Sequence, residues 1–157
     1  MAAKMSLFRP NLRNFGVCQE DPGWLYLFRS KNAYKVGKTS NPARREREAR
    51  TWLPDLNVIG TKPFWNVSEK ERLIHIGLTN FWLDREWFFF NGDGFEKVFV
   101  ETFQEFYDED RDMNSVDFTY WFNSSGMAEF VIEQKRQELS PKKFMHKHKR
   151  IVSLLNG

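Results

Sequence analysis

The fold of this chain is decided by the stretch GWLYLFRSKNAYKVGKTSNPARREREAR, residues 23–50. Two runs rich in aromatic and branched residues, 24–29 and 33–38, are separated by a short polar segment, which is typical of a β-hairpin. Ser40 or Asn41 then caps a basic helix that opens with a proline, since Ser and Asn are favoured caps and Pro fits the first helical position. The stretch therefore predicts a strand–turn–strand–helix unit.

The remaining patterns place this unit in an α/β domain of the α+β type, with a small three-stranded antiparallel sheet flanked by helices and a C-terminal helical extension. Apolar residues at helical spacing and the stops made by Pro and Gly define the other elements. We expect a third strand over 56–62 stopped by Pro63, a helix over 67–82, an extended segment over 85–90, and helices over 95–108 and 126–139.

The length of 157 residues favours one domain. We expect an N-terminal arm over 1–20, a principal domain over 21–110, and a helical extension with a basic tail over 111–157. No apolar run approaches the roughly 20 residues that span a bilayer, and the first residues lack a secretory signal pattern. The single cysteine, Cys18, excludes an internal disulfide and fits a reducing compartment, so we expect an intracellular, cytoplasmic protein without a membrane partner.

Charge is unevenly distributed along the chain, although the net charge is only +3. Basic residues crowd into 44–50 and 142–150, whereas acidic residues gather in 105–112, and this separation favours a polyanion binder. The alternative for each run is a solvated surface, and the C-terminal run is equally typical of a disordered tail. The candidates in that tail for contact with a nucleic-acid backbone are Lys142, Lys143, Lys147, Lys149 and Arg150.

Gly23-Trp24-Leu25-Tyr26 and Lys35-Val36-Gly37, in the deciding stretch, resemble the two sequence motifs of the GIY-YIG nuclease superfamily. Gly23-Trp24-Leu25-Tyr26 stands where that family has Gly-Ile-Tyr, and Lys35-Val36-Gly37 stands where it has Tyr-Ile-Gly. The chain resembles a phage-type branch whose second motif is Lys-Ile/Val-Gly, followed by a Glu, a His four residues later, and then Glu-Trp-Phe. Glu71, His75 and Glu86-Trp87-Phe88 occur here in that order, so the resemblance covers about 23–90.

The resemblance implies a DNA endonuclease that uses one Mg²⁺ or Mn²⁺ ion, and a phage-encoded protein of this kind would act in the host cytoplasm. It implies that Tyr26 and Lys35 face the scissile phosphate, that Arg45 contacts it, and that Glu71 binds the metal. His75 lies one turn after Glu71 and would orient it or contact phosphate. Glu86-Trp87-Phe88 is interpreted as structural packing. Lys38 and Arg44 complete the expected nucleic-acid contacts.

Physical chemistry supports these roles and also supplies their alternatives. A guanidinium fork matches phosphate oxygens, but position alone does not choose Arg45 over Arg44, and either can pair with a carboxylate on the helix surface. Tyr26 is suited to activate or orient water, and nearby cations would lower its pKa. Tyr34 is the alternative phenol. Because Tyr34 and Lys35 are adjacent in a strand, only one of them can face the phosphate.

Glu71 has a structural alternative as the last residue of a capping box that starts at Ser68. The same box fits one register earlier, from Asn66 to Glu69, and that register leaves Glu71 available. A single carboxylate suits Mg²⁺, which retains several waters. The histidines of the tail, His146 and His148, do not make a zinc site with His75.

Two other functions fit the sequence. Because Lys35 replaces the usual Tyr, the chain is also compatible with a DNA-binding or structural protein that keeps the fold without catalysis. The aromatic and acidic segment 105–122 is compatible with a protein-interaction module.

Overall fold

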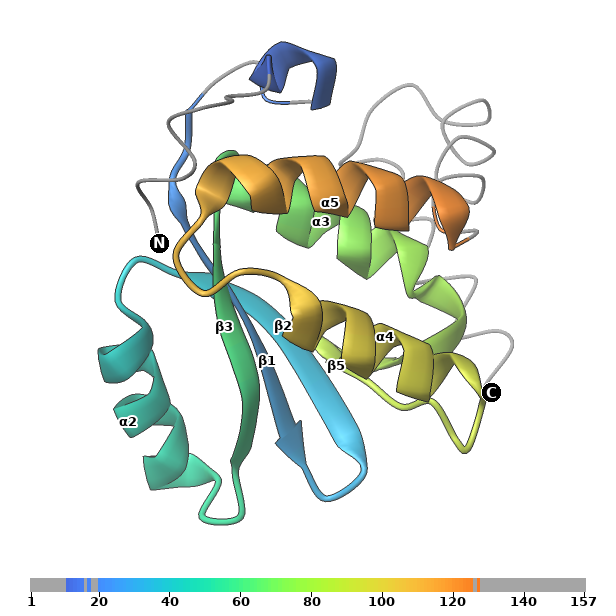
Figure 1. Ribbon diagram of the computed structural model, residues 1–157. Helices are drawn as coiled ribbons and strands as arrows, with labels where there is room; N and C mark the ends of the chain where they lie inside the picture. Colours follow the sequence, from blue (N-terminus) through green and yellow to red (C-terminus); the bar gives the residue numbers. More distant parts are fainter. Residues whose placement is uncertain (1–10, 16, 18–19, 126, 128–157) are drawn as a thin grey trace.

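The computed structural model describes residues 11–15, 17, 20–125 and 127, which form a mixed α/β fold around a five-stranded antiparallel sheet (Figure 1). The predicted class is confirmed, but the expectation of three strands is wrong. In the order β3-β1-β2-β5-β4, the strands are β3 (Asn57–Phe64), β1 (Gly23–Ser30), β2 (Ala33–Thr39), β5 (Trp87–Phe88) and β4 (Trp82–Asp84). The helices are α2 (Pro42–Trp52), α3 (Val67–Gly77), α4 (Phe95–Glu105) and α5 (Arg111–Ser124), with short 3₁₀ turns η1 (Leu12–Phe15) and η2 (Thr79–Phe81).

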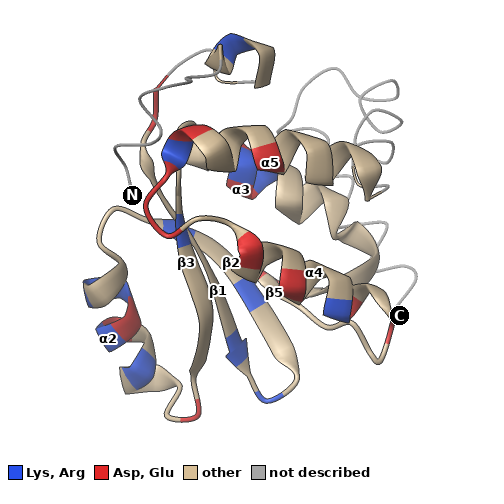
Figure 2. Cartoon of the chain, in the orientation of Figure 1, with Lys and Arg blue, Asp and Glu red and all other residues tan. Residues whose placement is uncertain are grey.

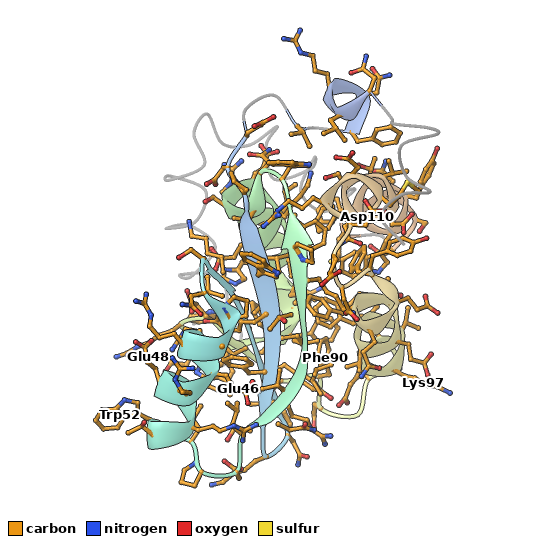
Figure 3. The ribbon with its side chains drawn as sticks, turned by 60° about the vertical axis from the view of Figure 1, so that its left-hand side comes forward. Glu46, Glu48, Trp52, Phe90, Lys97 and Asp110 are labelled. Atoms are coloured by element: carbon orange, nitrogen blue, oxygen red, sulfur yellow. The ribbon has the colours of Figure 1, made fainter. Side chains whose placement is uncertain are left out.

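The sheet separates α2 from the other described α-helices (Figures 1 and 3). Leu25 and Leu27 of β1 belong to the larger hydrophobic cluster, which includes buried residues of α3, α4 and α5. Tyr26 and Phe28 belong to a smaller cluster with Ala49 of α2. This division follows from the alternation of side chains along a strand. One face of the sheet is therefore thickly covered, and the other carries α2 alone among the described helices.

The deciding stretch folds as its sequence predicts. Ser30 pairs with Ala33 across a two-residue turn in which Lys31 adopts a left-handed φ of 56°. The carboxylate of Asp55 accepts hydrogen bonds from the Ser30 hydroxyl and the Lys31 amide, which ties the turn to the loop after α2. Of the two candidate caps of α2, Asn41 is the one used, because its side chain accepts a hydrogen bond from the Arg44 amide at 3.1 Å.

Pro63 does not end the third strand, which continues to Phe64. Among the described strands, β3 pairs only with β1, so it lies at an edge of the sheet. An edge strand tolerates Pro because the missing N–H is not required by a second neighbour. The expectation for Pro63 treated it as a stop without regard to its place in the sheet.

The segment expected to be one helix over 67–82 is shorter and ends in a strand. α3 ends at Gly77, a 3₁₀ turn follows, and Trp82 begins β4. β4 and β5 form a tight hairpin around Arg85, whose φ is 52°. The segment 85–90 is thus the second arm of a hairpin rather than an isolated strand.

The helical extension expected over 111–157 begins with α5, although the sequence patterns assigned a helix to 126–139 and none to 111–124. Asp110 caps the helix by accepting a hydrogen bond from the Met113 amide at 3.0 Å. Phe118, Trp121 and Phe122 are buried against the larger cluster. The segment is rich in residues with only moderate helix propensity, so burial against the core, rather than propensity, stabilises this helix. The helix expected over 126–139 and the basic tail lie outside the described residues.

No helix among the described residues combines the length and the apolar character needed to cross a bilayer.

Gly37 permits the closest packing on the sparsely covered face. Tyr26 lies opposite Gly37 in the β1–β2 register, and the phenol ring crosses β2 over this glycine. A Cβ at position 37 would overlap the ring, with the carbon Cε2 at 2.7 Å. The glycine of the second motif is therefore a packing requirement of Tyr26.

We expect Gly37→Ala to displace the Tyr26 ring and to lower the free energy of unfolding by about 2 kcal/mol, because overpacking a tight site typically costs 1–3 kcal/mol. Thermal or urea unfolding measures the change. Gly94→Ala is the matched control, since nothing lies within 4 Å of a Cβ there and the backbone is already helical. Adding Tyr26→Ala to Gly37→Ala should remove most of the overlap energy. Additive losses in the double variant would contradict this account.

Candidate functional site

Tyr26 stands at the centre of the sparsely covered face and contacts α2. The Nη2 atom of Arg45 donates a hydrogen bond to the Tyr26 hydroxyl at 3.3 Å, and the guanidinium carbon lies 5.3 Å from the ring centroid. The ring of Phe28 stacks on the ring of Tyr26, with the ring centroids 4.2 Å apart. The phenol is thus held by a ring, by a strand backbone and by a guanidinium.

Arg44 and Arg45 differ clearly in their surroundings. Arg44 is exposed and pairs with Glu48 at 3.9 Å on the helix surface. Arg45 is half-buried and reaches Tyr26. Because the two arginines are 100° apart around a helix, only one can point at the sheet.

Lys35 shares the face of Tyr26, whereas Tyr34 does not. The register pairs Tyr26 with Gly37 and Phe28 with Lys35, and residues directly opposite each other in a sheet point to the same side. Tyr34 belongs to the larger cluster on the other face and donates a hydrogen bond to Glu96 at 2.6 Å. Burial, and then the bond to Glu96, raise the pKa of Tyr34 to about 12. Of the two phenols, Tyr26 is the one next to Arg45 and Lys35.

Glu71 and His75 reach the site from α3 by binding the open edge of β2. β5 pairs with β2 only at Tyr34 and Lys35, so the backbone beyond them lacks a strand neighbour on that side. The Nε2–H of His75 donates to the Val36 carbonyl at 2.7 Å, and the Lys38 amide donates to the Glu71 carboxylate. Two residues along a strand span roughly 6.6 Å and four residues along a helix roughly 6 Å, so the two spacings match.

The helix start leaves Glu71 outside the cap. Asn66 is the N-cap residue of α3, and its Nδ2 donates to Glu69 at 3.0 Å. The Ser68 amide donates instead to Asp21, whose carboxylate has its pKa lowered by bonds from Ser68. The box that starts at Ser68 is thus not formed, and the carboxylate of Glu71 points to β2.

Charge and burial compete strongly in this site. Burial raises the pKa of Glu71 to about 7, and the neighbouring Glu86 carboxylate adds to the rise, while Lys38 and Lys35 oppose it. Burial lowers the pKa of Lys35, and Arg45 adds to that fall. His75 also has a lowered pKa, chiefly because of burial, which favours the neutral ring.

Burial opposes the fall that neighbouring cations were expected to cause in the pKa of Tyr26. Burial raises the pKa of the phenol, and the hydrogen bond and charge of Arg45 offset only part of that rise. The sequence argument counted the neighbouring cations but not the loss of water around a side chain that is 2% exposed.

Glu86 is a member of the site that the sequence analysis assigned to packing. Its carboxylate lies 3.7 Å from the Lys35 ammonium and acts electrostatically on Tyr26, Glu71 and His75. The next residue, Trp87, is the cross-strand partner of Lys35, and the Lys35 ammonium lies 5.9 Å from the Trp87 ring. The sequence signal for Glu86 was a charged residue at the start of an apolar run. The pairing of this run with β2, which brings Glu86 to Lys35, could not be predicted from the sequence.

The other predicted contacts are more peripheral. Lys38 is exposed and donates to the Ser68 hydroxyl at 2.7 Å, beside Glu71. Basic and acidic side chains alternate on α2, whereas acidic segments lie along α4 and the loop before α5 (Figure 2). The five tail residues Lys142, Lys143, Lys147, Lys149 and Arg150 lie outside the described residues.

A metal would find few protein ligands here. Among the described residues, no three carboxylate, His or Cys side chains gather as a metal cluster. The half-buried Glu71, with Glu86 acting on it, is a carboxylate site that a cation would stabilise. This donor set fits Mg²⁺, which binds through one or two carboxylates and keeps waters.

A family model for the T5orf172 domain matches residues 23–107, more than half of the chain. The chain belongs to the T5orf172 domain family. This domain is phage-associated and related to nuclease-like folds. No curated protein and no solved structure matches the chain significantly.

The match to the T5orf172 domain begins at the first residue of β1 and ends just after α4. It contains Tyr26, Lys35, Arg45, Glu71 and Glu86, so every group of the candidate site belongs to the domain. η1 and α5 lie outside the match. Membership of this family suggests a nuclease or DNA-binding role.

The raised pKa of Glu71 predicts a pH-dependent stability without added metal. A carboxylate with a pKa of about 7 in the folded protein, above its ordinary value of 4.5, contributes stability below the unfolded-state pKa, and this stability is lost as the pH rises through 7. After allowance for solvent screening, we expect the wild type to lose about 1–2 kcal/mol of its free energy of unfolding between pH 5 and pH 8 through Glu71. Glu71→Gln should not show this loss.

Urea unfolding at both pH values measures this difference. Glu69→Gln is the matched control, because Glu69 lies on the same helix and pairs with Asn66 and Arg72. Equal pH profiles for wild type and Glu71→Gln would show that Glu71 is not a strained carboxylate.

Proposed function

We propose that this T5orf172-family chain is a metal-dependent DNA endonuclease that hydrolyses phosphodiester bonds by a single-metal mechanism of the GIY-YIG type. The observation that carries the proposal is the convergence of four groups from β1, β2, α2 and α3 around β2: Tyr26, Lys35, Arg45 and Glu71. A phenol, an amine, a guanidinium and a carboxylate supply what phosphodiester hydrolysis requires.

Arg45 is the group best placed to bind the scissile phosphate. Its guanidinium is anchored at one end by the Tyr26 hydroxyl, which leaves other N–H groups of the fork to meet phosphoryl oxygens. The same hydrogen bond fixes the distance between the phosphate and the phenol. Arg45 would stabilise the charge that develops on the phosphoryl group.

Two groups can accept the proton of the attacking water. They are the Tyr26 phenolate and the neutral amine of Lys35. Burial acts against the first and in favour of the second, since it raises the pKa of Tyr26 and lowers the pKa of Lys35. We therefore assign Tyr26 mainly to orienting the water and Lys35 to accepting its proton.

Glu71 would hold Mg²⁺ or Mn²⁺, with Glu86 nearby. When bound, such an ion supplies Lewis-acid stabilisation of the phosphate and the leaving oxygen. The Lys38 amide keeps the Glu71 carboxylate oriented, and His75 fixes the same helix turn to β2. Both contacts limit the freedom of the carboxylate before any ion binds.

DNA would approach across α2 and the end of β2. Arg44 and Lys38 are exposed on either side of Arg45 and Glu71 and would contact backbone phosphates. Arg44 pairs with Glu48 and Lys38 donates to Ser68, and both contacts lie at the surface, where they are weak enough to be replaced by contacts with phosphate. The substrate class is supported by the family's nuclease-like or DNA-binding relation.

Cleavage of supercoiled plasmid with Mg²⁺ or Mn²⁺ tests the function. We expect metal-dependent nicking by the wild type and a loss of at least 10²-fold in Arg45→Ala and in Glu71→Gln, because each removes a charge from the reacting centre. Glu69→Gln should nick like the wild type. Salt-sensitive DNA binding without cleavage by the wild type would instead favour a non-catalytic DNA-binding protein.

A second experiment distinguishes the charge of Lys35 from its proton transfer. Arginine keeps the positive charge but stays protonated, so Lys35→Arg should be no more active than Lys35→Met if Lys35 accepts the proton. We expect both variants to lose about 10²-fold or more in kcat, and Tyr26→Phe to lose less. Activity of Lys35→Arg well above that of Lys35→Met would assign Lys35 to charge stabilisation alone.

A further inference from the structure

Arg111, the first residue of α5, lies against two tryptophans from the sheet. Its guanidinium carbon is 4.6 Å from the ring centroid of Trp24 and 5.5 Å from that of Trp65. The indole N–H of Trp65 donates to Asp112 at 2.9 Å, which fixes that ring. The guanidinium is therefore held by aromatic faces, an arrangement that favours a cation.

These rings place Arg111 at the same face as Tyr26. Trp24 is two residues before Tyr26 on β1, so alternation puts both side chains on one side of the sheet. Pro63 of β3 is the cross-strand partner of Trp24, so the two residues lie on the same face. Trp65, two residues after Pro63, continues on that face. Arg111 thus extends from the helical layer to Trp24, which lies about 7 Å along β1 from Tyr26.

The guanidinium has no anionic partner among the residues that the structure describes. Its Nε atom is buried and has no hydrogen-bond acceptor. The neighbouring carboxylates are bound elsewhere: Asp108 pairs with Lys62 at 2.7 Å, Asp110 caps α5, and Asp112 accepts from Trp65. An oriented but unpaired guanidinium is costly in the free protein unless it meets an anion.

We propose that Arg111 is a phosphate-binding residue that contacts the nucleic-acid backbone beside the Tyr26 site, with Trp24 and Trp65 holding its guanidinium in place. This inference rests on the proposed nucleic-acid substrate. Arg111 lies beyond residues 23–107, so the contact is a property of this chain rather than of the matched domain.

The alternative is that Arg111 only packs α5 against the sheet, and salt dependence separates the two roles. Loss of one phosphate contact reduces the slope of log affinity against log salt by about 0.9 for duplex DNA. A purely structural residue changes stability without changing that slope. The acidic loop before α5 opposes the phosphate, so we expect a moderate fall in affinity, about 3- to 10-fold at low salt.

The test is DNA binding by Arg111→Gln, measured as the fluorescence anisotropy of a labelled duplex over a range of salt concentrations. EDTA is present to prevent metal-dependent cleavage. Arg29→Gln is the matched control, because the Arg29 guanidinium also lies over a ring, 5.7 Å from Tyr34, but on the other face. We expect the loss of affinity and slope in Arg111→Gln only. A folded Arg111→Gln protein with wild-type affinity and slope overturns the inference.

An NMR titration of the wild type keeps the inference testable if Arg111→Gln does not fold. The buried Nε–H of Arg111 should give a slowly exchanging signal, assigned with Arg111→Lys, that shifts when a duplex is added in EDTA. An unchanged signal at saturation overturns the Arg111 contact but leaves the proposed function standing. No binding of any duplex by the wild type would remove the DNA substrate, and with it both proposals.

Discussion

The packing of the Tyr26 ring across Gly37 is the constraint on which the candidate site depends. A phenol can lie flat over a neighbouring strand only where that strand presents no side chain, and Gly37 supplies this space. Once the ring is there, its hydroxyl is displaced towards α2 and meets Arg45. The glycine therefore links the hairpin register to the position of the helix. The same burial that fixes the ring raises its pKa, so precise placement of the phenol comes at a cost to its acidity.

The incomplete pairing of β2 is the second determinant. A full neighbour strand would satisfy the backbone groups of Val36 and Lys38, and the side chains of His75 and Glu71 would then have no backbone partners on β2. Because β5 stops short, His75 and Glu71 replace the missing strand with side-chain hydrogen bonds. An edge that is usually a liability for aggregation is thereby covered and used to position a carboxylate. The short β5 also brings Glu86 to Lys35, so one sheet irregularity assembles both acids of the site.

Local patterns predicted those parts of the molecule whose cause is local. The β1–β2 hairpin, the Asn41 cap and α2 follow from turn residues and capping chemistry within a few positions of each other. Which phenol faces Arg45 was not predictable, because it depends on a register set by the whole hairpin. Glu86 was missed since its partner, Lys35, is joined to it only through a two-residue strand far along the chain. α5 was missed because burial of Phe118 and Trp121, rather than helix propensity, stabilises it.

The asymmetry of the two sheet faces explains why chemistry and stability can coexist in so small a chain. The larger cluster lies on the side of α3, α4 and α5, where Phe99, Phe103 and Phe118 are almost completely buried. Among the described residues, the opposite face carries α2 and a small cluster, so charged groups there displace little apolar packing. Burial still alters the proton affinities of the charged groups: it lowers the pKa of Lys35 on this face and raises the pKa of Glu71 at the edge of β2. Shifts of this kind, caused by burial beside specific charges, are typical of sites that carry acid–base chemistry.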